Sequence, residues 1–288
     1  MKINDVFIIG GGPAGISCAI QLSRYGIEPI LLERKNIGGL LLNANYIENY
    51  PGFPEGIKGS ELTKLLKKQL ERNKVKILYE EVLNLSFNKK IMEIKTNKNI
   101  YYSKFAVIAS GTKPKKFKDF TIPEKVKTKI FYEVYTLGTL KNKKIAIVGS
   151  GDAAFDYALG LEKQNEIIIL NRKKESKCIP ILFDRVKKSR KLNYMTDIKI
   201  KSIKSSDNTI LLKCITLKGA INIKIDYLVF AIGRVPSLDF LSEGLKKKFS
   251  KKLYLAGDVK NGIFRQASIA AGDGIKTAMQ IYRKIKEE

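Results

Sequence analysis

Three closely spaced glycines near the amino terminus are the first residues of this chain that suggest a chemistry: Gly10, Gly12 and Gly15. They follow an apolar run, residues 6–9, and at this spacing they permit a tight turn, close approach of the backbone to a pyrophosphate and close packing of the next helix. The start of that helix offers free N–H groups and the positive end of the helix dipole, which favour an anion. Glu33 ends the next apolar run, where a carboxylate accepts hydrogen bonds from a ribose diol. Strand, turn, helix and acid together predict a dinucleotide site rather than an ordinary glycine turn.

A second pattern of small residues lies in the middle of the chain, at Gly149, Gly151 and Ala154. It follows the apolar run 144–148, and the next apolar run ends in Asn171 instead of an acid. Three basic residues come directly after Asn171, namely Arg172, Lys173 and Lys174. Because loss of the acid and gain of cations suit a 2′-phosphate, this site favours NADPH over NADH. Solvated surface charge is the alternative in so lysine-rich a chain, which leaves NADH open.

Two strand–turn–helix units must position these turns, so we expect an α/β protein with two Rossmann-like dinucleotide-binding domains. Apolar strands over 105–109 and 227–232 each end near a glycine, and Pro114 and Pro236 follow them. These two places are interpreted as crossings between the domains, with the second domain inserted in the first. The predicted boundaries are residues 1–112 plus 237–288 for the first domain and 113–236 for the second.

The remaining elements of the first domain are read from hydrophobic periodicity. A helix is predicted over 60–73, where leucines recur at helical spacing, and strands are predicted over 75–87 and 90–95. A final helix over 268–286 would complete this domain.

Histidine is absent from the 288 residues, which excludes Ser-His-Asp and Cys-His catalysis, His-ligated metals and a histidine acid or base. The three cysteines are widely separated and never form a C-x-x-C pair: Cys18, Cys178 and Cys214. They indicate neither a disulfide framework nor a metal site. The chemistry must therefore be carried by a cofactor or by carboxylate, lysine or tyrosine groups.

The formal net charge is +26, which could attract a polyanion. The lysines are nevertheless spread along the chain, and no aromatic-interleaved nucleic-acid motif is present, so we predict no nucleic-acid partner. No apolar run reaches the ~20 residues that a membrane helix needs, and the first strand begins at Ile3, which leaves no room for a signal peptide. These features predict a cytoplasmic protein without a membrane partner.

Several segments together resemble the low-molecular-weight thioredoxin reductase family, and the resemblance covers almost the whole chain. Its motifs are Gly10–Gly15, Gly38–Gly39, Ile47–Pro54, Ala109–Gly111, Ala231–Gly233, Ala256–Asp258 and Arg265–Ala267. The resemblance implies FAD in the first domain, NADPH in the inserted domain and a homodimer.

The same resemblance implies roles for individual residues. Glu33 would bind the adenosine ribose and Asp258 the ribityl chain, and the residues beside the flavin would be Arg265, Gln266 and Ala267. The basic residues at the 2′-phosphate would be Arg172, Lys173 and Lys177. Further cofactor contacts are implied at Pro13, Ala14, Arg34, Gly39, Leu40, Asn49, Val82, Ala109, Gly111, Asp152, Ala153, Ile232, Gly233 and Gly257.

One departure from this family concerns its redox dithiol. The two cysteine positions are Tyr132 and Tyr135 here, and the acid that follows them is Thr136. Because tyrosine neither attacks a disulfide nor forms one, a dithiol relay is excluded at this place. Residues 131–161 are instead similar to the thioredoxin-reductase-like ferredoxin-NADP reductases, which lack the dithiol and pass electrons singly to a carrier protein.

The function predicted from these observations is transfer of hydride from NAD(P)H to FAD, then of electrons to a small protein carrier. We predict cofactor chemistry without a catalytic side chain, because hydride transfer from nicotinamide to flavin requires no side-chain acid or base. A basic surface suits an acidic ferredoxin or flavodoxin. Three alternatives stay open: an atypical thioredoxin reductase acting through flavin or Cys178, an NAD(P)H oxidase, and a non-catalytic FAD-binding redox sensor. The intact second turn at Gly149 and Gly151 argues against the sensor, which would need only one dinucleotide site.

Overall fold

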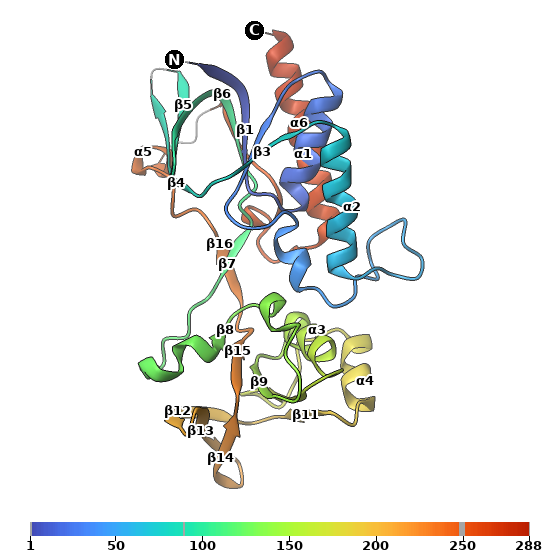
Figure 1. Ribbon diagram of the computed structural model, residues 1–288, viewed down its shortest axis with the longest axis vertical. Coiled ribbons are helices and arrows are strands. Elements are labelled where there is room, and N and C mark those ends of the chain that lie inside the picture. The colour runs from blue at the N-terminus through green and yellow to red at the C-terminus, as the bar shows by residue number, and fades with distance from the viewer. Residues whose placement is uncertain (1, 89, 248–250, 288) are drawn as a thin grey trace. The chain divides into compact units, whose positions relative to one another are not determined.

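The computed structural model describes residues 2–88, 90–247 and 251–287, and Figure 1 labels its elements. The chain forms two compact units. The first comprises Met1–Leu42, Glu48–Lys113 and Val235–Glu288, and the second comprises Asn43–Ile47 and Pro114–Arg234. The second unit is therefore inserted in the chain of the first, and strands β7 (Thr112–Pro114) and β16 (Arg234–Pro236) pair where the chain crosses.

The short segment 43–47 groups with the second unit, whereas the boundaries drawn from the sequence place it in the first. Hydrogen bonds account for this difference. The side-chain oxygen of Asn43 accepts the backbone N–H groups of Val134 and Tyr135, both at 2.9 Å. The N–H of Asn45 donates to Asp156 Oδ2 at 2.8 Å.

The first unit is built on one mixed sheet with the order β3-β2-β1-β6-β5-β4, and β17 also pairs with β6. The parallel strands are β1 (Ile3–Ile9), β2 (Ile30–Glu33), β3 (Lys76–Tyr79), β6 (Ile100–Ile108) and β17 (Leu253–Leu255). The antiparallel strands are β4 (Val82–Asn88) and β5 (Ile91–Thr96). Residues 6–9 of β1 are buried, which explains their continuous apolar sequence.

Helices cover this sheet and complete the first unit. They are α1 (Pro13–Arg24), α2 (Gly59–Arg72), the short α5 (Glu243–Lys247) and α6 (Ala267–Glu287), with 3₁₀ turns at Gly39–Asn43 and Gly257–Val259. Helix α1 contacts both α2 and α6, and the three lie side by side in Figure 1. The last helix of the chain is thus packed against the helix that starts at the first glycine turn.

The second unit repeats the central arrangement of the first. Its parallel sheet has the order β11-β10-β9-β15-β8, and a three-stranded antiparallel sheet, β12-β13-β14, packs on its core. The strands are β8 (Ile130–Phe131), β9 (Lys144–Val148), β10 (Glu166–Leu170), β11 (Leu192–Met195), β12 (Lys199–Ser206), β13 (Thr209–Thr216), β14 (Gly219–Ile225) and β15 (Tyr227–Phe230). The helices are α3 (Asp152–Leu161) and α4 (Pro180–Lys188), with 3₁₀ turns at Glu124–Lys129 and Tyr135–Leu137.

The shared strand order, β3-β2-β1-β6 in one unit and β11-β10-β9-β15 in the other, is that of a doubly wound dinucleotide-binding sheet. The prediction of an α/β fold with two Rossmann-like domains is confirmed. Within the described ranges, no helix is both long enough and apolar enough to cross a membrane.

Candidate functional site

The first glycine turn leaves no room for side chains where the chain folds tightly and leaves open space where a ligand would bind. A Cβ at Gly10 would lie 2.4 Å from the Ala109 carbonyl oxygen, and one at Gly15 would lie 1.9 Å from the Gly10 carbonyl oxygen. A Cβ at Gly12 would meet nothing within 4 Å. Gly12 is also the N-cap of α1, without a side-chain cap, and Pro13 is its first residue. The turn therefore fits an anion such as the FAD pyrophosphate.

Glu33 is held beside this turn at the end of β2. Its Oε2 accepts the N–H of Gly11 at 2.8 Å, and its Oε1 accepts the N–H of Lys35 at 2.8 Å. Both carboxylate oxygens keep a further lone pair, so Glu33 can still accept hydrogen bonds from ribose hydroxyls. The N–H of Glu80 donates to the Glu33 carbonyl at 3.0 Å, which brings the predicted contact Val82 close to this end of β2.

The other residues predicted for the first site come from distant parts of the chain. Gly257 lies against the helix start, because a Cβ there would be 2.8 Å from the Ala14 Cβ. Asp258 follows it, half-buried in the same 3₁₀ turn. The side-chain amide of Asn49 donates to Gln266 Oε1 at 2.9 Å, so these two predicted residues are in contact.

Four further residues of the first unit are predicted cofactor contacts. Arg34 extends to an exposed ion pair with Glu81 at 3.6 Å, and a Cβ at Gly39 would lie 3.3 Å from the Gly12 Cα. Leu40 follows in the same 3₁₀ turn and is half-buried. Gly111 has a positive φ of 61° and accepts the N–H of Ser237 at 3.1 Å.

Asp273 organises the loop that carries Asp258, although no motif of the sequence predicts this role. Its Oδ2 accepts the Gly257 N–H at 3.1 Å and the Asn261 side-chain amide at 2.6 Å, and its Oδ1 pairs with Lys260 Nζ at 3.1 Å. Burial acts to raise the pKa of Asp273, but these hydrogen bonds and the Lys260 charge outweigh burial and hold the pKa below its ordinary value. Only an isolated acid in an otherwise apolar helical stretch marks it in the sequence.

We expect the stability of the chain to depend on the charge of Asp273. Because its folded-state pKa lies below that of the unfolded chain, its contribution is present above about pH 4 and is lost as the pH falls through the folded-state value. Asp273→Asn should lower the free energy of unfolding by about 1 kcal/mol at pH 7, and the difference from wild type should be smaller at pH 3. Urea unfolding at both pH values measures this. A difference that is the same at pH 7 and pH 3 would contradict it.

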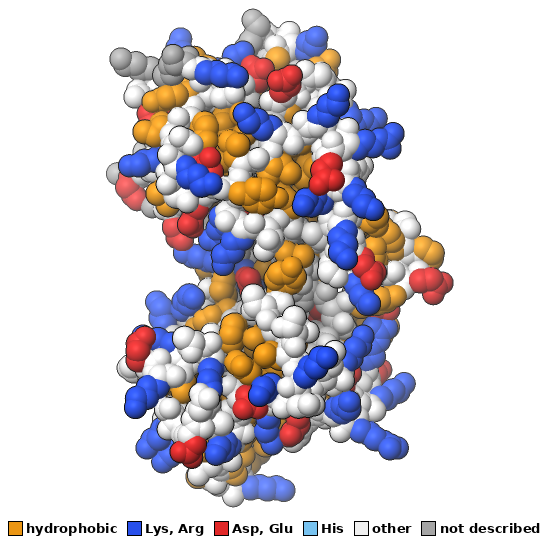
Figure 2. All heavy atoms as spheres, in the orientation of Figure 1, with side chains coloured by type: hydrophobic (Ala, Val, Ile, Leu, Met, Phe, Trp, Pro, Cys, Tyr) orange, Lys and Arg blue, Asp and Glu red, His pale blue; other side chains and the backbone are white. Residues whose placement is uncertain are grey.

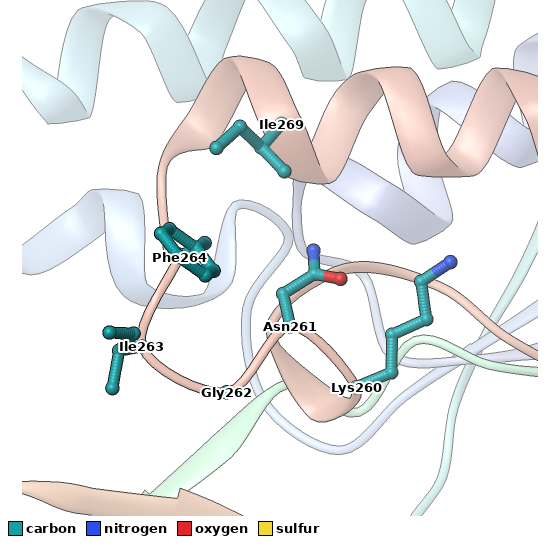
Figure 3. A pocket seen from close by; sticks show the side chains of 6 residues that line it. All are labelled: Lys260, Asn261, Gly262, Ile263, Phe264 and Ile269. Atoms are coloured by element: carbon teal, nitrogen blue, oxygen red, sulfur yellow. The ribbon is translucent and has the colours of Figure 1, made fainter.

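A hollow of about 510 Å³ lies next to this loop. Figure 3 shows the side chains that line it. It is lined by Lys260, Asn261, Gly262, Ile263, Phe264 and Ile269. Ile263 is 88% exposed and Phe264 is 70% exposed, although Arg265, one of the residues predicted beside the flavin, comes directly after them. The loop thus presents an apolar tip to solvent.

The second glycine turn has the same construction as the first. A Cβ at Gly149 would lie 2.6 Å from the carbonyl oxygen of Ala231, which follows β15. In the first turn, a Cβ at Gly10 would meet the carbonyl oxygen of Ala109, which follows β6, in the same way. A Cβ at Gly151 would meet nothing within 4 Å, and Gly151 is the uncapped N-cap of α3. Asp152 and Ala153, the first residues of α3, are exposed. This turn therefore fits a second pyrophosphate.

The loop after β10 carries the predicted 2′-phosphate residues, and Asn171 organises it from inside. Asn171 is buried, and its Oδ1 accepts the N–H of Lys173 at 3.1 Å. Its side-chain amide donates to the Glu175 carbonyl and to the Tyr194 hydroxyl, both at 2.9 Å. The predicted cations, Arg172, Lys173 and Lys177, are all exposed. The backbone N–H of Lys177 donates to the Ser150 carbonyl at 2.8 Å, which joins this loop to the second glycine turn.

The last two residues predicted for the second site follow β15. Ile232 is half-buried, and Gly233 has a positive φ of 109°. The Gly233 carbonyl accepts the N–H of Lys115 at 2.9 Å. The backbone therefore turns at the same point of the sheet as it does at Gly111 in the first unit.

Tyr132 and Tyr135, which the resemblance matches to the family's dithiol positions, have different environments. The Tyr132 hydroxyl accepts the N–H of Phe117 at 3.1 Å, and its ring packs 5.6 Å from that of Phe230. The Tyr135 side chain is 49% exposed. All three cysteines are free, and burial raises the pKa of Cys214 to about 11.

The two glycine turns, each with its sheet and open helix start, define a protein with two separate dinucleotide-binding folds. The family described as "Pyridine nucleotide-disulphide oxidoreductase" matches residues 4–274, and the chain belongs to this family. It is an NAD(P)H-dependent flavoprotein reductase of the thioredoxin reductase type, with FAD and NADP(H) as cofactors.

Thioredoxin reductases are similar to this chain over nearly its whole length. The thioredoxin reductase of Buchnera aphidicola subsp. Schizaphis graminum is 30% identical, over 96% of each chain. The structure of Lactococcus lactis thioredoxin reductase gives a TM-score of 0.88 at 27% identity, covering 99% of this chain and all of that one. That of T. acidophilum thioredoxin reductase gives 0.87 at 26% identity, covering 99% of each chain.

Proposed function

We propose that this reductase passes electrons from NADPH through FAD to a small carrier protein of the ferredoxin or flavodoxin type, without a redox dithiol. The observation that carries the proposal is the environment of Tyr132. It stands at a dithiol position, yet its hydroxyl is bonded to Phe117 and its ring is packed on Phe230. A partly buried tyrosine that packs against the core at this position leaves electron release to the flavin.

In this proposal the first domain, residues 1–112 plus 237–288, binds FAD. The first glycine turn and the start of α1 bind the pyrophosphate, and Glu33 binds the ribose. Asp258, with the segment Arg265–Ala267, positions the flavin. FAD, when bound, accepts hydride and releases electrons to the acceptor.

The second domain, residues 113–236, binds NADPH. The second glycine turn and the start of α3 bind its pyrophosphate, and the cations of the loop after β10 bind the 2′-phosphate. No side-chain acid or base is required for hydride transfer, which agrees with the absence of histidine.

The surface charge supports an acidic partner. Figure 2 shows Lys and Arg side chains distributed over the visible face, with fewer acidic side chains between them. With a net charge of +26, the chain attracts an acidic carrier at long range and speeds its encounter. A cytoplasmic location, where such carriers are found, is part of the same proposal.

We also propose that the chain forms a homodimer, as its resemblance to the thioredoxin reductase family implies. The apolar tip formed by Ile263 and Phe264 supports this, because apolar side chains so exposed mark contact surfaces.

A second candidate acceptor is a disulfide, as the family description and the names of the relatives suggest. Cys178 is the one cysteine that is not fully buried, so it is the residue through which a thiol route would run. Reduction of oxygen and a pure sensor role are the remaining alternatives.

Anaerobic stopped-flow absorbance distinguishes these functions. We expect NADPH to bleach the flavin band, and ferredoxin or flavodoxin to restore it at least about ten times faster than oxidised thioredoxin. Cys178→Ser is the matched control and should leave both rates unchanged. Faster recovery with thioredoxin, lost in Cys178→Ser, would establish the disulfide route instead. Recovery with oxygen alone would indicate an oxidase, and no bleaching by NADPH would overturn the reductase proposal.

A further inference from the structure

We propose that Asp152 is a positioning residue for nucleotide specificity, an inference that rests on the NADPH site proposed above. Asp152 fixes the loop 171–179 against the second glycine turn, so that the cations of this loop are in place for a 2′-phosphate. Asp152 is the first residue of α3. Its Oδ1 accepts the backbone N–H of Ile179 at 2.9 Å. The carboxylate is therefore bonded to the loop.

A carboxylate at the start of α3 is unexpected at a pyrophosphate site unless it has a separate role. It would lie near the negative pyrophosphate, and like charges close together weaken binding. An acid does stabilise a helix start, but only by about 0.3–1 kcal/mol at an exposed site. The hydrogen bond to the Ile179 N–H supplies such a role, because it ties the loop to the start of α3.

Two serines strengthen the same junction. The Ser150 carbonyl accepts the N–H of Lys177 at 2.8 Å and the hydroxyl of Ser176 at 3.1 Å. The Ser176 oxygen in turn accepts the N–H of Cys178 at 3.1 Å. Consecutive residues from 176 to 179 are thus bonded, directly or through Ser176, to the turn formed by residues 150–152.

Asn171 anchors the other end of the loop. Besides its side-chain bonds to Lys173 and Glu175, its own N–H donates to the Met195 carbonyl at 2.8 Å. The cations lie between two fixed ends, one at Asn171 and one at Asp152.

This arrangement affects two nucleotides differently. Cations that are already ordered bind a phosphate with less loss of conformational freedom than cations on a loose loop. NADP⁺ has the 2′-phosphate that would use them, and NAD⁺ does not. Loosening the loop should therefore weaken NADP⁺ binding and leave NAD⁺ binding nearly unchanged.

Calorimetric titration of the FAD-loaded full chain with NADP⁺ and with NAD⁺ tests this. Asp152→Ala should raise the dissociation constant for NADP⁺ about tenfold and that for NAD⁺ less than twofold. Asp152→Asn, which keeps an acceptor oxygen for Ile179, should restore NADP⁺ affinity to within about twofold of wild type. Asp184→Ala removes an exposed acid from the neighbouring α4 and should leave the ratio of the two constants unchanged.

The thiol of Cys178 provides a readout that does not depend on nucleotide binding. It follows directly on Lys177 and is half-buried, whereas Cys18 and Cys214 are buried. Its labelling by a disulfide reagent should be several times faster in Asp152→Ala than in Asp152→Asn. Burial and then the Asp152 charge raise the pKa of this thiol; both variants remove that charge, and only Asp152→Asn keeps the bond to Ile179. An equal rise in the dissociation constants for NADP⁺ and NAD⁺ would show that Asp152 affects the part that the two nucleotides share, and would overturn the proposal. Equal labelling of Asp152→Ala and Asp152→Asn would overturn it as well.

Discussion

Replacing Gly12 by alanine is expected to give a folded protein that no longer binds FAD. Gly12 has φ −81° and ψ −178°, which any residue adopts, and a Cβ there would meet nothing within 4 Å. The fold therefore tolerates the methyl group. The open space lies at the start of α1, where a methyl group keeps the backbone from approaching the pyrophosphate. We expect FAD affinity to fall about 100-fold, or about 2.7 kcal/mol.

FAD titration of the purified variant measures this loss, and thermal unfolding should match that of wild type stripped of flavin. Gly151→Ala is the matched control at the second turn, where φ is −100° and the space is equally open. It should remain yellow but lose reduction by NADPH. Wild-type FAD affinity in Gly12→Ala would place the pyrophosphate elsewhere, and an unfolded variant would show that the space is not free.

The two glycine turns could be predicted from sequence because their chemistry is local. At Gly10 and Gly15 the place of a side chain is occupied by backbone atoms, those of Ala109 after the neighbouring strand β6 and those of Gly10 in the turn itself. This constraint appears in the sequence directly as the glycine spacing. Glu33 ends the strand next to the turn, so its position in the sequence determines its position in the fold.

The hydrogen bonds that hold the outer parts of the sites could not be predicted in this way, although the resemblance implies Asp152 itself as a cofactor contact. Asp273 is 16 residues from Gly257, and Asp152 is 27 residues from Ile179, and each is recognised only by its partner. A carboxylate that accepts a hydrogen bond from a backbone N–H of another loop produces no periodic pattern in the sequence. Such pairs depend on tertiary packing, which single-sequence reasoning does not resolve.

The strand predicted over 75–87 is in fact two strands, β3 and β4, separated at Glu80. The Glu80 side chain is buried, and its carboxylate accepts the hydroxyls of Thr96 at 2.6 Å and Tyr101 at 2.8 Å. Apolar residues stand on both sides of the break, which is why the sequence predicts one strand. A buried carboxylate needs hydrogen-bond partners, and Glu80 finds them on the neighbouring strands, where the chain leaves β3. The need of the Glu80 carboxylate for hydrogen bonds therefore outweighs the local preference of residues 75–87 for one continuous strand.

Gly274 sets the packing of the last helix, and its replacement by alanine is expected to destabilise the first unit. A Cβ at Gly274 would lie 2.1 Å from the Ala14 carbonyl oxygen and 3.0 Å from the Cys18 nitrogen, both backbone atoms of α1. The helices would have to separate, so we expect a loss of at least about 3 kcal/mol.

Gly272 is the matched control for this substitution because it lies on the same helix, is exposed and has nothing within 4 Å of a Cβ. Gly272→Ala should gain up to about 1 kcal/mol from helix propensity. Urea unfolding of the FAD-saturated variants compares the two. Equal stability of Gly274→Ala and Gly272→Ala would mean that α6 does not need its close approach to α1. A lower stability for Gly274→Ala, together with weaker FAD retention, would show that helix packing behind the glycine turn maintains the flavin site, since α1 begins at that turn.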